Sequence, residues 1–147
     1  MRFHTLQAIR KEEGKSLLVY KDTLGHLTVG VGHKVLPEDN LRLGESITEA
    51  KSSALFLADL KKAQDGVEDL IPLTGSQPPI VEHVLTCMVF QMGVSGVLGF
   101  IRFLKALEHC NYALAAKEML DSKWACEDSP ERAQRLANEL WTPRPKA

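Results

Sequence analysis

A helical segment followed at once by a tight β-hairpin constrains the fold of this chain more than any other feature. Residues 3–13 carry apolar side chains close to the spacing of a helical stripe, and Gly14 is a typical stop signal for a helix. Two short runs rich in branched and aromatic residues follow at 17–20 and 26–29, and a turn signal with Gly25 separates them. The pattern therefore predicts a small unit of one helix and one hairpin.

Two carboxylates flank this hairpin. Glu13 lies in the last turn of the predicted helix, where the negative helix end disfavours a further negative charge. Asp22 lies beside the turn. Taken singly, a solvated glutamate and a turn-forming aspartate are the commoner situations. Taken together, two carboxylates in different environments can divide the roles of acid and base, as hydrolysis of a glycosidic bond requires.

The length of the hairpin loop decides whether Asp22 and Thr28 share a face. A two-residue loop would put their side chains on opposite faces of the hairpin. A three-residue loop of residues 23–25 instead pairs Asp22 with His26 and Tyr20 with Thr28. Because side chains alternate along a strand, Asp22 and Thr28 then point to the same side. We expect the three-residue loop.

The rest of the chain is helical in pattern. Thr48 is expected to cap a long helix that runs to about residue 70 and ends before Pro72. Residues 80–92 are apolar on most sides, which predicts a central buried helix that Gly93 ends. Further helices are expected at 100–108, at 112–121 and from Ser129, with Pro130 in the first helical position. The predicted fold class is α+β, mainly α.

Composition excludes several classes of function. The chain has 147 residues, 44% of them hydrophobic, and a net charge of -1, which is ordinary for a globular protein and gives no electrostatic footprint for nucleic acid. Residues 1–7 lack the apolar run of a signal peptide, and no segment is expected to span a membrane.

Cys87 lies in an apolar helical run and is expected to be a buried, reduced thiol.

No cofactor or metal is expected. The sequence Gly30-Val31-Gly32 has too few glycines, wrongly spaced, for a dinucleotide-binding loop. No second histidine or cysteine lies at metal-ligand spacing from His33, which argues against a zinc site. A histidine fixed by a carboxylate for structural reasons is the commoner situation.

Three blocks of sequence, in the same order, resemble the lysozymes of T-even bacteriophages and their relatives in glycoside hydrolase family 24. They span residues 10–33, residues 47–59, and a third region that begins at Met88 and continues in pieces to Ala133. The resemblance implies a two-lobed fold: a helix-plus-hairpin lobe over about residues 1–46, a larger helical lobe over about 73–147, and a joining helix near 47–72. It also implies a single lysozyme domain with a cleft between its lobes.

The activity implied by this resemblance is hydrolysis of the β-1,4 bond between N-acetylmuramic acid and N-acetylglucosamine in bacterial peptidoglycan. By position, Glu13 matches the family's general acid and Asp22 its second catalytic carboxylate. Thr28 matches the threonine that helps to hold the attacking water. The implied scheme is inverting, with general acid and general base on opposite faces of the sugar.

Further positions match residues that bind substrate or hold the fold. Phe90 and Gln91 match cleft residues, and Arg132 matches an arginine that contacts the catalytic glutamate. His33 and Asp59 match a buried structural ion pair. These roles are implied by the resemblance alone.

The biological setting expected from the resemblance is a phage endolysin that lyses the host cell. Such a protein is expected to be a monomer without membrane insertion, held in the host cytoplasm until a holin opens the membrane and then acting in the periplasm. The holin acts upstream without binding to it. Two alternatives remain: a muramidase used as a bacteriocin or secretion effector, and a non-catalytic relative that only binds peptidoglycan.

Overall fold

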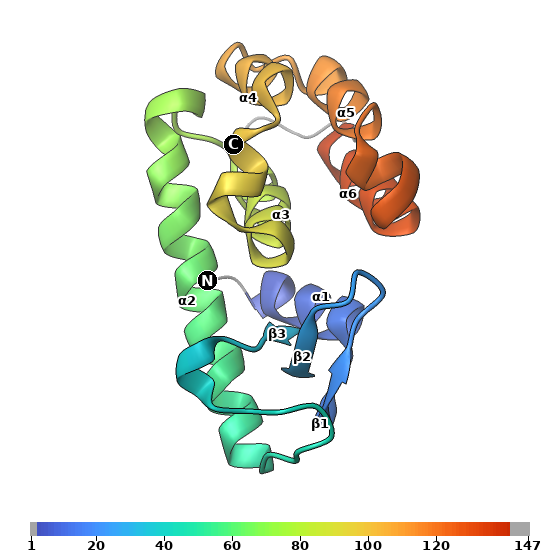
Figure 1. Cartoon of the computed structure of the whole chain (residues 1–147). Coiled ribbons are helices and arrows are strands. Elements are labelled where there is room, and N and C mark those ends of the chain that lie inside the picture. Colours follow the sequence, from blue (N-terminus) through green and yellow to red (C-terminus); the bar gives the residue numbers. More distant parts are fainter. Residues whose placement is uncertain (1–2, 142–147) are drawn as a thin grey trace. The chain divides into compact units, whose positions relative to one another are not determined.

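The structure, a computed structural model, describes residues 3–141 and is mainly helical with one small antiparallel sheet (Figure 1). The predicted fold class is confirmed. The chain forms two compact units, Met1–Lys62 and Ala63–Ala147, and the boundary between them falls inside the long helix α2 (Glu49–Thr74). The predicted division into lobes and a joining helix stays a prediction.

The first unit is built on the helix and hairpin that the sequence predicts. Helix α1 (Phe3–Glu13) leads into a three-stranded antiparallel sheet of β1 (Ser16–Lys21), β2 (Leu27–Gly30) and β3 (His33–Lys34), in the order β1-β2-β3. Tyr20 pairs with Thr28, and the Asp22 N–H donates to the His26 carbonyl at 2.9 Å. The hairpin loop therefore has three residues, as predicted, and Asp22 continues the face that Tyr20 and Thr28 share.

Two short elements of the first unit were not predicted. Strand β3 has only two residues, too few for a periodic signal, and it pairs with β2 through His33 and Val29. The 3-10 helix η1 (Pro37–Asp39) follows, and it has only three residues. Asp39 closes this turn by accepting the Leu36 N–H at 2.8 Å, which brings its carboxylate back toward the sheet.

Helix α2 begins as predicted and ends later than predicted. The Lys51 N–H donates to the Thr48 hydroxyl at 3.0 Å, so Thr48 caps the helix. The prediction that the helix ends before Pro72 is wrong, since it continues to Thr74. Proline removes one N–H donor, and this close to the helix end the remaining bonds suffice: the Gly75 N–H donates to the Ile71 carbonyl at 2.7 Å.

Replacing Thr48 by alanine removes this cap. We expect Thr48→Ala to lower the free energy of unfolding by about 1 kcal/mol, the usual contribution of a threonine N-cap. Urea denaturation followed by circular dichroism measures it, and Thr48→Ser, which keeps the hydroxyl, is the matched control. Equal stability of the alanine variant and the parent would show that the cap contributes nothing.

The second unit is a helical bundle. Up to residue 141, where the described part of the chain ends, it contains the end of α2 and five further helices: α3 (Pro79–Leu98), α4 (Ile101–Glu108), α5 (Tyr112–Leu120), the π-helix η2 (Trp124–Asp128) and α6 (Pro130–Trp141). The prediction that Gly93 ends the central helix is confirmed as a break within α3, because Gly93 has φ 76° and ψ 167°. Cys87 is buried, also as predicted.

The apolar core of this unit centres on α3. Val84, Met88 and Val97 of α3 are fully buried, as are Leu107, Met119 and Ala133 from the helices around it. Helix α3 is the one described helix that is long and apolar enough to cross a membrane by length and composition. Its buried side chains are part of the core of the unit, and a core helix passes the same test of length and composition.

Candidate active site

The end of α1 fixes the position of Glu13. Gly14 follows with φ +66° and donates its N–H to the Arg10 carbonyl at 3.0 Å, a left-handed cap that few other residues form without strain. Glu13 is therefore the last helical residue, and its side chain is half-buried. It lies against the backbone of Gly32, in the turn between β2 and β3: a Cβ placed on Gly32 would come within 2.7 Å of Glu13 Cδ.

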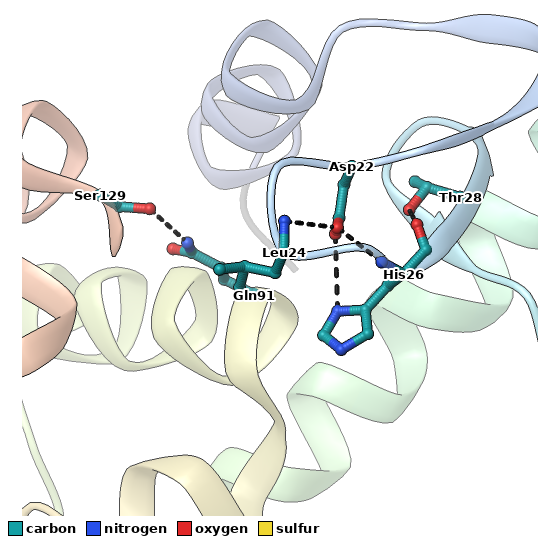
Figure 2. Close-up of polar contacts among 6 residues, drawn as sticks. All are labelled: Asp22, Leu24, His26, Thr28, Gln91 and Ser129. Atoms are coloured by element: carbon teal, nitrogen blue, oxygen red, sulfur yellow. Dashed lines mark hydrogen bonds and ion pairs between the residues drawn. The ribbon is translucent and has the colours of Figure 1, made fainter. Parts of the chain in front are cut away.

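The hairpin turn holds the carboxylate of Asp22. Its Oδ1 accepts the N–H of Leu24 at 2.9 Å and the N–H of His26 at 2.8 Å, as Figure 2 shows. The His26 ring lies on the other oxygen, with Nδ1 3.6 Å from Oδ2. Partial burial would raise the pKa of Asp22, but these two backbone donors, with the charges of His26 and Lys34, outweigh it and hold the pKa below its ordinary value. Asp22 is therefore ionised at neutral pH.

Thr28 lies on the same face of the hairpin as Asp22. The residue is only 4% exposed, and its hydroxyl donates to the His26 carbonyl at 3.1 Å (Figure 2). Because this bond uses the hydroxyl proton, the oxygen has acceptor lone pairs left and no second proton to donate. Toward a water molecule, both the carboxylate of Asp22 and the hydroxyl of Thr28 can therefore only accept.

Tyr20 joins these residues and was missed by the sequence analysis. Burial raises the pKa of its phenol, and the charges of Glu13 and Asp22 raise it further. The phenol thus lies within electrostatic reach of both carboxylates. The predicted hairpin register could have indicated this position, since Tyr20 pairs directly with Thr28.

His33 lies between two carboxylates. Its Nδ1 is 2.7 Å from Asp59 Oδ2 on α2, and its Nε2 is 2.7 Å from Asp39 Oδ2 in η1. The hydrogen bond to Asp59 raises the pKa of His33; burial opposes the shift, and Asp39 adds to it. With an acceptor on each ring nitrogen, the imidazolium donates in both directions. Asp39 was missed because nothing in the sequence marks a residue six positions after His33 as its partner.

The other predicted residues belong to the second unit. Gln91 is held at both ends of its amide: Nε2 donates to Ser129 Oγ at 2.8 Å, drawn in Figure 2, and Oε1 accepts the Trp124 indole N–H at 3.1 Å. Phe90 and Arg132 are half-buried on α3 and α6. Their substrate-binding roles, and the expected contact of Arg132 with Glu13, stay predictions.

A pocket of about 440 Å³ opens in the same unit, between the start of α4 and the end of α5. Phe100, Glu118 and Ser122 are among the residues that line it. The ring of Phe100 also meets the Trp124 ring edge-on, with centroids 6.1 Å apart. The aromatic partner of Gln91 is thus part of the packing that shapes this pocket.

Comparison with known proteins shows the family of the chain. Residues 10–138 match the family model described as phage lysozyme. The chain is 35% identical to the "Probable T4-type lysozyme 1" of Dictyostelium discoideum, over 91% of each chain. It is 34% identical to the "Endolysin" of Salmonella phage P22, over 82% of this chain and 81% of the relative. It is also 28% identical to the "Pre-baseplate central spike protein Gp5" of Enterobacteria phage T4, of which it covers 27%.

A helix-plus-hairpin unit and a helical bundle in one chain, together with these matches, define a glycoside hydrolase of the lysozyme class. The chain belongs to the phage lysozyme family. That membership assigns it lysozyme activity, the hydrolysis of glycosidic bonds in peptidoglycan.

Proposed function

We propose that this protein is an inverting muramidase of the endolysin type, which cleaves the β-1,4 bond between N-acetylmuramic acid and N-acetylglucosamine. The observation that carries the proposal is the environment of Asp22. Two backbone N–H groups keep its carboxylate ionised, and the hydrogen-bonded turn fixes its position. A general base needs both properties.

Glu13 is the general acid in this scheme. Its proton goes to the glycosidic oxygen as the bond from that oxygen to the anomeric carbon breaks. On the opposite face of the sugar, a water molecule gives its proton to Asp22 while its oxygen bonds to the anomeric carbon. The released sugar thus has inverted configuration, and Glu13 and Asp22 exchange their protons with solvent before the next cycle. Such a scheme needs carboxyl groups roughly 6.5–9.5 Å apart, so that the water fits between the base and the sugar.

Thr28 orients the attacking water. Since its hydroxyl proton is committed to the His26 carbonyl, it accepts one water proton while Asp22 accepts the other. A water held by two acceptors directs an oxygen lone pair away from both of them. That lone pair is the one that attacks the sugar.

The anomeric configuration of the first product tests the scheme. Purified peptidoglycan is digested, and proton NMR follows the new reducing ends before mutarotation equilibrates them. Inversion of the β-linkage gives the α-anomer first. An initial β-anomer would exclude the inverting scheme while leaving lysozyme activity intact. Binding to peptidoglycan without any new reducing ends would favour the non-catalytic alternative.

We propose further that the enzyme serves host lysis and is held in the host cytoplasm until another protein, a holin, permeabilises the membrane. Its similarity to a phage protein named endolysin supports this setting. Expression alone in a Gram-negative host should leave cells intact, and chloroform should then lyse them promptly. Spontaneous lysis without chloroform would contradict the proposal and show that the protein reaches the wall unaided. A bacteriocin or effector role would instead require killing of neighbouring cells.

A further inference from the structure

The Glu13 side chain lies close against the turn between β2 and β3 at Gly32. A Cβ on this residue would lie 2.7 Å from Glu13 Cδ and 2.8 Å from Glu13 Cγ, well inside van der Waals contact. Gly32 also has φ +67°, a left-handed conformation that glycine adopts without strain. The general acid therefore rests on bare backbone, at a place where any other residue would push against it.

The turn that carries Gly32 is held from its other side. At Gly30 a Cβ would lie 3.0 Å from Ser52 Oγ, so this end of the turn is packed closely against α2. His33, the next residue after Gly32, is tied to Asp59 of α2 and to Asp39 of η1. The backbone at Gly32 is thus anchored to α2 on both flanks and has little freedom to retreat from Glu13.

We propose that Gly32 is a positioning residue for the general acid, because its bare backbone is the surface that sets where the Glu13 carboxyl lies. The inference rests on the proposed role of Glu13 as general acid. A methyl group at position 32 displaces the carboxyl, because the anchored turn cannot yield and the glutamate side chain can. Displacement of a catalytic group by about 1 Å is enough to lower a rate by roughly 100-fold.

The test compares Gly32→Ala with Gly44→Ala. Gly44 has φ +85° and lies in the same unit, and a Cβ there meets nothing within 4 Å, so its alanine variant carries backbone strain without a collision. We expect Gly32→Ala to lower kcat by about 10- to 100-fold with KM nearly unchanged. Gly44→Ala should keep the parent kcat. Similar kcat values for the two variants would overturn the proposal.

A second readout reports on the glutamate directly. With carboxyl-labelled glutamate, the Glu13 carboxyl carbon resonance should move in Gly32→Ala and stay in place in Gly44→Ala. A reduced kcat with an unmoved Glu13 resonance would mean that Gly32 acts by another route. The resonance also separates this inference from the proposed function. If an active Glu13→Gln variant showed that Glu13 is not the general acid, the shift of the Glu13 resonance between the parent and Gly32→Ala would still report the contact.

If Gly32→Ala fails to fold, a double variant tests whether collision with the Glu13 side chain is the cause. In a Glu13→Ala background the side-chain atoms that meet the new methyl group are gone, and only the backbone strain remains. If collision is the cause, the double variant Glu13→Ala, Gly32→Ala folds, with a loss of melting temperature like that of Gly44→Ala. A double variant that also fails to fold would overturn the contact as the explanation.

Discussion

Glu13→Gln should lower the rate of peptidoglycan hydrolysis by about 10²–10⁴-fold, the usual contribution of a general acid. The amide has nearly the size of the carboxyl, so it fits against Gly32 and leaves the end of α1 unchanged, but it has no acidic proton to give to the leaving oxygen. The melting temperature should therefore stay near that of the parent. Turbidity of chloroform-treated Gram-negative cells measures the rate, and calorimetry measures the melting temperature.

Glu12→Gln is the matched control. Glu12 is the preceding residue on the same helix and is also half-buried, so its substitution makes the same change of charge beside the site. We expect this variant to clear cells at close to the parent rate. A folded Glu13→Gln variant that clears them as fast as Glu12→Gln would exclude Glu13 as the general acid.

The helix and hairpin of the first unit were predictable because their signals are local. Gly14 ends α1 through a bond to Arg10, four residues away. The three-residue loop follows from the turn chemistry between Asp22 and His26, and it alone decides which side chains share a face with Thr28. The candidate acid and base could therefore be placed on their elements from a stretch of fewer than thirty residues.

The contacts that tune these elements join residues that no local signal connects. Asp39 reaches His33 only because η1 folds back toward the sheet, and Gly32 meets Glu13 only because the turn between β2 and β3 packs on α1. The Gln91 amide meets Trp124 and Ser129 across 33 and 38 residues. The local signal at Pro72 also failed, because the backbone bond from the Gly75 N–H to the Ile71 carbonyl continues the helix past a residue that usually ends one.

The Asp39–His33–Asp59 cluster should contribute strongly to the stability of the fold. His33→Gln should lower the free energy of unfolding by about 3–5 kcal/mol, the range for breaking a buried ion pair, because it leaves Asp39 and Asp59 facing one another without the cation between them. The side chain of His33 is 5% exposed and those of Asp39 and Asp59 are 13% and 18% exposed, so water screens the cluster only weakly.

The loss of stability should depend on pH in a defined way. The folded-state pKa of His33 is raised by the hydrogen bond to Asp59, so the contribution of His33 is full below its ordinary value of 6.5 and fades as the pH rises through the higher folded value. The pKa of Asp39 is lowered: burial opposes this, but the hydrogen bonds from His33 and from the Leu36 N–H, with the charges of His33 and Lys51, together outweigh it. The contribution of Asp39 is therefore present above its ordinary value of 3.8 and lost as the pH falls through the lower folded value.

The difference in unfolding free energy between the parent and His33→Gln should consequently be largest between pH 3.8 and 6.5 and should shrink on both sides. Guanidinium denaturation at a series of pH values measures it. His109→Gln is the control, because the His109 side chain is 65% exposed and its loss removes a histidine without a buried partner pair. A difference for His33→Gln that is no larger than that for His109→Gln, or that does not change with pH, would show that the two carboxylates contribute no net stabilisation through His33.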